Sequence, residues 1–357
     1  MRAAPVLLAS FAAFAALDGA VFHTSLYPWI LSPDGSTGRV EMVLRNERER
    51  PKDGPQVLGI GDSRMIMLPR VANEHTAETG YTFGTIATPG ASPRSWYYML
   101  RDTDPTARSY RAILLAVESY DDAEIWDDDA DNERDLSYIV ARLRLGDLWE
   151  FSHSYDDWSK RWRAARGILL KGLVYKRDFE DLLLHPISRI RYAQLAHRDS
   201  FGWLYGYHGP PDTVSGFQVD WRARTLAAPP NANPDLVDGL KGRLFSAPPP
   251  ESGRKSRYMK YWLGKIYDRY RDSPTRLIFL RLPRGGFVRP DQPPYNPHSS
   301  VRELAAHPNI TLIDEHFFDS LEKPELFHDQ LHLNGPGMDR FSVMIAQEVA
   351  RILGPPR

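Results

Sequence analysis

The sequence contains no cysteine, so no disulfide can hold the fold or reveal the redox compartment in which the protein works. It also lacks an excess of charge, because 45 lysines and arginines against 46 aspartates and glutamates leave a net charge of −1. This balance argues against a general electrostatic partnership with nucleic acid. No repeat of fixed period and no low-complexity tract interrupts the 357 residues, which suffice for one large domain or two.

Proline and tryptophan, in contrast, are abundant. The 29 prolines indicate a surface rich in loops, and the nine tryptophans supply many aromatic contacts. Tryptophans in this number suit a protein that binds sugar or lipid, but such residues more often serve as anchors of a core or an interface.

The longest apolar run lies near the N-terminus. Arg2 precedes the segment APVLLASFAAFAALDGAVF, which holds roughly eighteen nearly uncharged residues and has Asp18 near its end. Asp18 and the bulky apolar residues after it make a poor cleavage site, so we predict an uncleaved signal anchor over residues 1–24. This reading places the protein in the cytoplasmic membrane with one span and a periplasmic domain. A cleaved signal, giving a secreted protein, and a buried soluble helix are the alternatives.

Strand-like and helix-like segments alternate through the rest of the chain. Polar, breaker-rich stretches predict a linker at residues 25–54 and a globular domain at residues 55–357. Amphipathic helical patterns lie between several apolar segments, and MDRFSVMIAQEVARIL closes the chain as a helix. The alternation predicts an α/β fold with a doubly wound, five-stranded parallel sheet covered by helices on both faces. The predicted strands are Gln56–Gly61, Tyr81–Ala87, Ala112–Val117, Arg276–Leu282 and Ile310–Asp314.

The middle of the chain breaks this alternation. Residues 123–272 are rich in Arg, Trp, Tyr and Pro, and we predict a mostly helical insertion between the third and fourth strands. Its acidic run DDDADNERD lacks the glycine and the final glutamate of an EF-hand loop, which favours a solvated turn over a calcium site. The predicted helices are Leu136–Trp149, Trp158–Arg166 and Ser256–Tyr270.

The segment VLGIGDSRMIML presents a hydroxyl where a strand ends. Val57 to Ile60 are typical of a buried strand, and Ser63 follows it directly. Ser63 is therefore a candidate nucleophile, and the alternative is that it only caps the next helix. A serine hydroxyl needs a base before it can attack an acyl group.

The segment LFHDQLHLNGPG offers that base. Asp329 and His332 are three residues apart just before the final helix, so the carboxylate can orient the imidazole and stabilise the imidazolium that forms. Two alternatives remain. His328, Asp329 and His332 could bind a metal, although no second cluster completes such a site, or Asp329 could cap a helix.

Taken together, these segments resemble the SGNH (GDSL-type) hydrolase superfamily. GDS follows the first strand, a glycine follows the second, and D-x-x-H stands just before the last helix. The resemblance implies a flavodoxin-like three-layer fold in which Ser63 is the nucleophile, His332 the general base and Asp329 its orienting acid. It also implies that the amides of Ser63 and Gly90, the latter in IATPGASP, stabilise the oxyanion. The sequence has no G-x-S-x-G elbow, which argues against the α/β-hydrolase fold.

One block departs from the family pattern. The family usually carries G-x-N-D after the third strand, where this chain has LLAVESYDD and no asparagine. A carboxylate aimed at an oxyanion is repulsive, so we expect Glu118 to serve another purpose and Ser119 to replace the asparagine only in part.

This departure, the membrane anchor and the insertion resemble cell-envelope acylation proteins, namely DltD-like and alginate O-acetylation-type proteins. These proteins work beside a membrane-bound O-acyltransferase on a cell-wall polymer or exopolysaccharide. The candidate substrate-binding residues are Arg64, Ser119, Arg281 and Arg284. Arg281 and Arg284, which follow the fourth strand, could hold an anionic polymer, although solvated surface arginines would give the same pattern. Aromatic residues in the insertion are candidates for a sugar platform or for the insertion's own core, namely Trp203, Tyr205, Tyr207 and Trp221.

The sequence therefore predicts an extracytoplasmic O-acyltransferase or acylesterase that acts on an envelope polysaccharide through an acyl-serine. Acyl transfer is favoured over net hydrolysis, and no cofactor or metal is implied. The competing hypothesis is a non-catalytic scaffold of the same fold, which binds a glycan or the membrane-bound O-acyltransferase.

Overall fold

The computed structural model describes residues 3–122, 132–199, 214–246, 253–290 and 295–355. Its centre is a sheet of five parallel strands in the order β2-β1-β3-β6-β7. Each of the five predicted strand segments contains one of these strands, so this part of the prediction is confirmed. The strands are β1 (Gln56–Ile60), β2 (Thr82–Thr85), β3 (Ala112–Val117), β6 (Arg276–Arg281) and β7 (Ile310–Leu312).

The burial of the strands explains their sequences. Every residue of β1 and β3 is buried, as expected for parallel strands that are covered on both faces and read as continuous apolar runs. The register places Val57 of β1 between Phe83 of β2 and Ala112 of β3. From β1 the chain adds β2 on one side of the sheet and then adds β3, β6 and β7 on the other, so the strand order switches between β1 and β3. In such sheets ligands bind beyond the carboxyl ends of the strands at this switch point.

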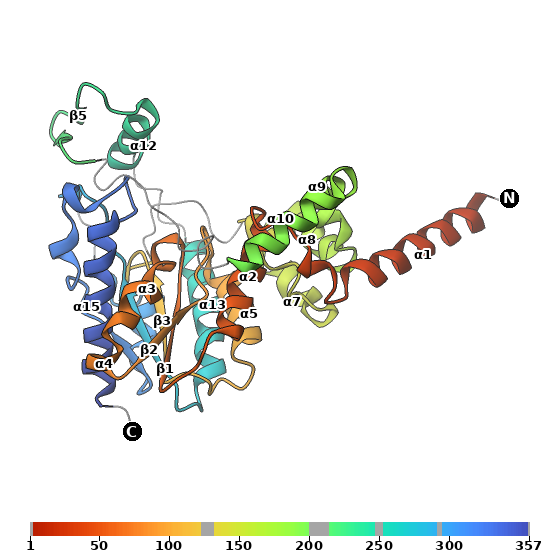
Figure 1. Ribbon diagram of the computed structural model, residues 1–357, viewed down its shortest axis with the longest axis horizontal. Coiled ribbons are helices and arrows are strands. Elements are labelled where there is room, and N and C mark those ends of the chain that lie inside the picture. The colour runs from red at the N-terminus through yellow and green to blue at the C-terminus, as the bar shows by residue number, and fades with distance from the viewer. Residues whose placement is uncertain (1–2, 123–131, 200–213, 247–252, 291–294, 356–357) are drawn as a thin grey trace.

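Helices cover both faces of the sheet (Figure 1). One face carries α3 (Leu68–Ala72) and α15 (Gly335–Leu353), with α4 (Thr76–Thr79) beside them. The other face carries α2, α5, α13 and α14, of which α2 packs on α5 and α13 packs on α5, α14 and β6. Their bounds are α2 (Ser36–Glu49), α5 (Pro93–Thr103), α13 (Gly253–Tyr270) and α14 (Ser300–Leu304).

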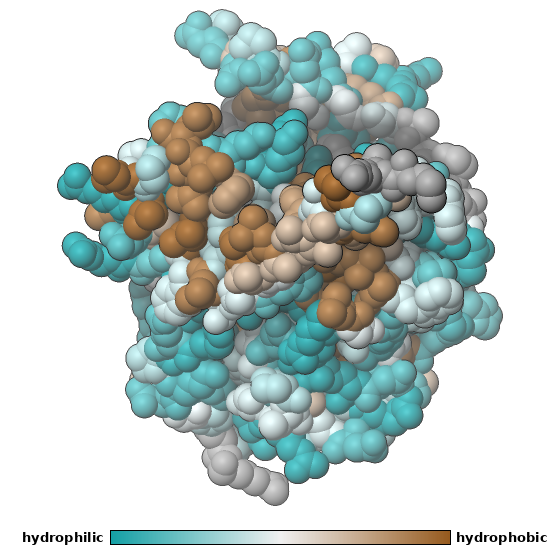
Figure 2. Space-filling model, turned by 90° about the vertical axis from the view of Figure 1, so that its right-hand side faces the viewer, coloured by the Kyte–Doolittle hydropathy of each residue, from teal (hydrophilic) through white to brown (hydrophobic). Residues whose placement is uncertain are grey.

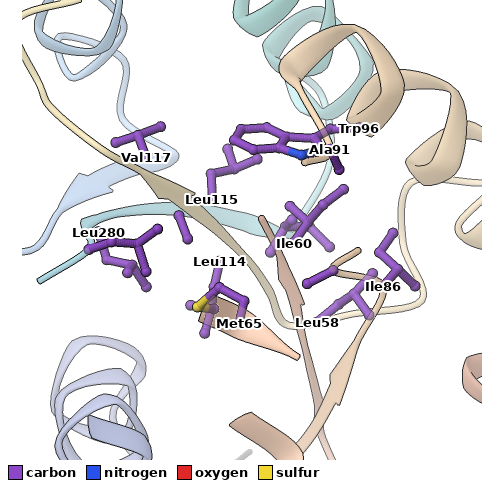
Figure 3. Packing of buried hydrophobic residues seen from close by; sticks show 14 of the residues in the cluster. Leu58, Ile60, Met65, Ile86, Ala91, Trp96, Leu114, Leu115, Val117 and Leu280 are labelled. Atoms are coloured by element: carbon purple, nitrogen blue, oxygen red, sulfur yellow. The ribbon is translucent and has the colours of Figure 1, made fainter. Parts of the chain in front are cut away.

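Apolar packing fixes the end of β1 from which Ser63 projects. Met65, just after Ser63, is fully buried in the main core together with Ile60, Trp96 and Leu114, as Figure 3 shows. At Gly61 an added Cβ would lie 2.9 Å from the Met65 Cγ and 3.0 Å from the Ala116 Cβ, so the turn leaves no room for a side chain. The closely packed Gly61 before Ser63 and the buried Met65 after it thus fix the backbone that carries the Ser63 side chain.

The predicted linker at residues 25–54 is wrong in its second half. Residues 36–49 form α2, and Val40, Val43 and Leu44 on one side of it join the main core. The sequence conceals this helix because charged residues surround its apolar stripe, and these residues find partners: Glu41 pairs with Arg142, and Glu47 with Arg50. The α/β body therefore begins near residue 36 rather than 55.

The insertion is mostly helical in its described parts, as predicted, but it divides into two regions. The first region holds α6 to α10 and the second holds a small antiparallel hairpin, β4–β5, followed by α12. The predicted helix Leu136–Trp149 is interrupted, because Asp147 accepts the Arg144 backbone N–H and starts a new turn. The elements are α6 (Arg134–Ile139), α7 (Leu148–His153), α8 (Trp158–Leu169), α9 (Gly172–Leu184), α10 (Pro186–Arg198), β4 (Gln218–Asp220), β5 (Thr225–Ala227) and α12 (Pro234–Phe245).

The insertion boundary at residue 272 also needs correction, because α13 belongs to the core layer. Met259, Trp262 and Ile266 of this helix are buried in the main core, and the helix makes the crossover from β3 to β6 that parallel strands require. Most of the predicted acidic turn lies in residues 123–131, outside the described residues. Single 3-10 turns complete the chain at Tyr27–Trp29, Ser63–Met65, Asn73–His75, Leu145–Asp147, Asp319–Leu321 and Pro324–Leu326.

The N-terminal helix α1 (Ala3–Phe22) projects away from the α/β body (Figure 1). Its residues Ala4–Phe22 have a mean hydropathy of 1.8 and are long and apolar enough to cross a membrane or to act as a signal anchor. The predicted apolar helix is therefore present.

Candidate active site

Ser63 stands at the carboxyl end of β1 and does not cap a helix. The cap of its 3-10 turn is Asp62, whose side chain accepts the Arg64 backbone N–H at 2.9 Å. The next helix, α3, begins after Met67 and has no side-chain cap. The alternative that Ser63 serves only as a helix cap is therefore wrong, and its hydroxyl is available for another partner.

That partner is His332, which lies 269 residues away in sequence. The Ser63 Oγ is 2.6 Å from the His332 Nε2, and the His332 Nδ1 is 2.8 Å from the Asp329 Oδ2. The three side chains thus form a continuous line from hydroxyl to imidazole to carboxylate, in the order needed for a proton to pass from serine to histidine. The structure brings together all three residues that the sequence reading combined.

The loop between η7 (Pro324–Leu326) and α15 holds the histidine in place. Phe327 and Leu333 form a β-bridge, and the His328 N–H donates to the His332 carbonyl at 2.8 Å. Asn334 accepts the Gly337 N–H and so caps α15. Because Asn334 is the cap, Asp329 is not needed for that purpose, and its Oδ1 instead accepts the Leu331 and His332 backbone N–H groups at 2.8 and 2.7 Å.

The environment keeps Asp329 ionised. Burial acts to raise the pKa of its carboxyl, but the His332 side chain and the two backbone N–H groups outweigh burial and lower the pKa to about 2. The carboxylate therefore carries a negative charge throughout the neutral range. The His332 side chain is 33% exposed, so a substrate can reach the line of three residues from solvent.

Arg64 is not open to a substrate, so its prediction as a binding residue is wrong. Only 7% of it is exposed, and its Nη2 pairs with Asp62 at 2.6 Å and with Glu118 at 2.8 Å. Burial alone would lower the pKa of Arg64, but the two carboxylates raise it. The same pair shows what Glu118 does: its carboxylate, just after β3, pairs with Arg64.

Arg281 and Arg284 lie near the carboxyl edge as predicted, but they are bound to acidic side chains rather than exposed for a polymer. Arg281 is 3% exposed and pairs with Asp319 at 2.6 Å, and Arg284 pairs with Glu322 at 2.6 Å. An anionic polymer would have to displace these carboxylates. The Ser119 side chain is also buried, and its Oγ accepts the Asp121 N–H at 3.0 Å.

Gly90 occupies a turn that requires glycine. The Ala91 N–H donates to the Thr88 carbonyl, and Gly90 at the third position has φ +70°, as in a type II turn with proline before it. The Thr88 N–H donates to the Gly61 carbonyl at 3.4 Å, which joins this turn to the strand end that carries Ser63. An oxyanion role for the Gly90 amide stays a prediction.

Arg243 of α12 is a residue at the edge of the site that the sequence reading missed. It is 8% exposed, and its Nη2 donates to the Arg284 carbonyl at 3.0 Å. Burial lowers its pKa to about 10, while the charges of Glu118 and Asp329 act in the opposite direction. The available signal was an arginine next to Leu244 and three residues after Leu240, both buried on the same helix.

The predicted aromatic platform is only partly visible. Trp203, Tyr205 and Tyr207 lie outside the described residues, and the Trp221 ring packs edge-on against Phe245, with 6.1 Å between ring centroids. Within the residues that the structure describes, no three His, Asp or Glu side chains gather as a metal site would require.

No protein-family model matches the chain, and a search of curated proteins finds no match. What the structure itself defines is an α/β protein with a five-stranded parallel sheet, an N-terminal apolar helix and a serine–histidine–aspartate line at the carboxyl end of β1.

Proposed function

We propose that the protein is an SGNH-type serine acyltransferase or acylesterase that acts on an extracytoplasmic glycan. The observation that carries this proposal is the 2.6 Å contact between the Ser63 Oγ and the His332 Nε2, with Asp329 bound to the other ring nitrogen. The strand order supports it, since 2-1-3-4-5 is the flavodoxin-like order and Ser63 stands at its switch point.

The reaction would begin with proton transfer from the Ser63 hydroxyl to the His332 Nε2 as Oγ attacks the acyl carbonyl. The tetrahedral intermediate then expels its leaving alcohol, which takes the proton from His332, and an acyl-serine remains. In the second half, His332 removes a proton from an acceptor hydroxyl, whose oxygen attacks the acyl group. Ser63 recovers its proton as the new ester, or the free acid if water is the acceptor, departs.

The amides of Ser63 and Gly90 would stabilise the oxyanion in both halves. The ion pair between Arg64 and Glu118 supports this assignment, because it compensates the carboxylate that stands where the family carries asparagine. The second candidate function, a non-catalytic scaffold that binds a glycan or a membrane-bound O-acyltransferase, is favoured by the absence of that asparagine.

In this proposal α1 is an uncleaved anchor in the cytoplasmic membrane, and the domain faces the periplasm. Anchoring supports work on an envelope polysaccharide beside a membrane-bound O-acyltransferase as partner. Protease digestion of intact spheroplasts tests the topology: we expect loss of the domain, and full protection would show that the domain is inside.

The activity test uses the full chain in lipid nanodiscs with an activated acetyl ester, with and without an oligosaccharide. We expect acetyl release that requires Ser63, and acetylated oligosaccharide when the acceptor is present. Ser63→Ala should abolish both products. Ser188→Ala, the same substitution at an exposed position of α10, should leave them unchanged. Acetate release that no glycan alters would favour the esterase, and no turnover by folded protein would favour the scaffold.

A further inference from the structure

The helices α8, α9 and α10 leave large apolar side chains exposed at the end of the molecule from which α1 projects. Ile187 is 83% exposed and Leu184 is 75% exposed, and both stand where α9 meets α10. Trp158 and Trp162 on α8 are exposed as well. Figure 2 looks onto this end, and apolar residues form a broad area across it. Monomeric proteins in water rarely leave such an area uncovered.

This apolar area is joined directly to α1. The Asp18 carboxylate of α1 accepts the backbone N–H groups of Lys171 at 3.1 Å and Gly172 at 2.8 Å, at the start of α9. A negative charge at a helix N-terminus is favourable, and here it is buried. At Gly172 an added Cβ would lie 2.6 Å from the Asp18 Oδ1, so only glycine allows this approach.

Aromatic packing strengthens the joint. The Phe22 ring at the end of α1 lies 4.7 Å from the Tyr27 ring and 5.5 Å from the Tyr175 ring, measured between centroids. Together with Leu31, Val140 and Leu182, these residues form a second hydrophobic core, separate from that of the sheet. The carboxyl end of α1 is thus built into α9, and α9 cannot lie far from the surface of any bilayer that α1 crosses.

The charge of these helices differs from that of the whole chain. Residues 158–198 contain ten Lys and Arg against three Asp and Glu, a net charge of +7 in a chain of net charge −1. All three acidic residues have basic partners within the same helices: Asp178 and Asp181 pair with Arg189, and Glu180 pairs with Lys176. Basic residues beside exposed Trp and Leu are typical of helices that lie in the headgroup region of an anionic bilayer.

We propose that α8–α10 form a second membrane contact, in which Leu184, Ile187 and the α8 tryptophans enter the headgroup region of an anionic lipid bilayer. This inference rests on the proposed membrane span of α1. A protein surface would also accept apolar side chains, but the excess of positive charge and the rigid joint to α1 favour lipid. With two contacts the domain cannot rotate freely about its anchor, so the serine site keeps a fixed orientation to the membrane.

The absence of cysteine makes a direct test possible, because each introduced cysteine gives one labelling position in the full chain. Three variants would each carry a nitroxide in vesicles of phosphatidylethanolamine and phosphatidylglycerol: Ile187→Cys, Leu8→Cys in α1, and Arg340→Cys at an exposed position of α15. Accessibility to dissolved oxygen and to a water-soluble nickel chelate measures depth in the bilayer. We expect position 340 to be open to nickel, position 8 to be closed to it, and position 187 to show a several-fold loss of nickel accessibility with oxygen accessibility retained.

Three other outcomes would overturn the inference. Position 187 as open to nickel as position 340, with position 8 embedded, would show that α8–α10 face water while α1 still spans the membrane. Position 187 closed to both reagents, with spin–spin broadening that disappears on dilution with unlabelled chain, would show contact between two copies. Position 8 open to nickel would instead disprove the membrane span itself, and the serine chemistry would remain to be judged by its own assay.

Discussion

The carboxyl edge of the sheet and the helices α8–α10 satisfy their side chains in opposite ways. At the sheet edge, arginines that the sequence suggests for ligand binding are paired within the protein, and Arg281 is only 3% exposed. On α9 and α10, in contrast, leucine and isoleucine side chains face outward, although such residues are normally buried in a core. Within the described residues, the side chains at the sheet edge thus have partners in the protein, whereas the apolar side chains on α9 and α10 remain exposed.

The energies of the two regions explain this difference. Breaking a buried ion pair costs roughly 3–5 kcal/mol, so the sheet edge is held firmly around Ser63. An exposed leucine or isoleucine forgoes about 1.5–3 kcal/mol of burial, so several together on α9 and α10 make association with an apolar phase favourable. The charged side chains at the sheet edge are therefore paired within the protein, whereas the exposed apolar side chains of α8–α10 are covered only when another surface contacts them.

The largest effect is expected from Asp329→Asn. An amide in place of the carboxylate favours the wrong tautomer of His332 and cannot stabilise the imidazolium, so acetyl-ester turnover should fall by about a thousandfold or more. The measurement is the initial rate in nanodiscs. Asp339→Asn, at an exposed position of α15, is the matched control and should keep the rate of the natural chain. A variant at Asp329 with unchanged turnover would remove the aspartate from the mechanism.

Arg64→Leu should destabilise the sheet edge strongly. It leaves Asp62 and Glu118 without their shared buried partner, and we expect a loss of about 3 kcal/mol in the free energy of unfolding. Denaturant unfolding of the purified chain measures it, with Arg340→Leu as the exposed control. If both leucine variants unfold alike, the sheet edge is not held by its ion pairs.

The pH dependence of stability should reveal Asp329. Its pKa is about 2 in the folded protein and roughly 3.9 in an unfolded chain, so the ionised carboxylate contributes roughly 2–3 kcal/mol. Because the folded pKa is the lower one, this contribution is present above about pH 4 and is lost as the pH falls to about 2. Asp329→Asn should lack this part of the pH dependence. Parallel profiles for the two proteins between pH 4 and 2 would contradict the assignment.

The smallest effect on stability is expected on the helices that expose apolar residues. Ile187→Ser removes no buried contact, so the free energy of unfolding should change by less than about 0.5 kcal/mol. Leu115→Ala in β3 should cost roughly 2–5 kcal/mol, because it opens a cavity in a fully buried strand. Denaturant titrations of the two variants compare the regions directly. Equal losses would mean that Ile187 is covered within the protein after all.

Local patterns predicted a large part of this fold, and long-range pairing explains what they missed. The strands follow from short apolar runs between breakers, and the contact of Asp329 with His332 follows from their spacing of three. The sequence presents the charge of Arg64 but not its Glu118 partner 54 residues away, so its burial could not be foreseen.

The apolar residues at the end of α9 and the start of α10 are exposed, which their sequence does not indicate. An apolar stripe on a helix normally indicates a core, and nothing local in Leu183, Leu184 or Ile187 reveals that they face outward. In α2 the reverse happened, because charged residues conceal a stripe that is buried. For α2 the deciding contacts are tertiary, because Val40, Val43 and Leu44 pack in the main core around the sheet.

The most direct test of the central claim is covalent labelling by a serine-reactive phosphonate. The full chain in nanodiscs should gain the mass of one phosphonyl group, and peptide mapping should place the group on Ser63. Ser63→Ala should gain none, while Ser188→Ala should be labelled like the natural chain. Absence of labelling in folded protein, or labelling that persists in Ser63→Ala, would contradict the assignment of Ser63 as an activated nucleophile.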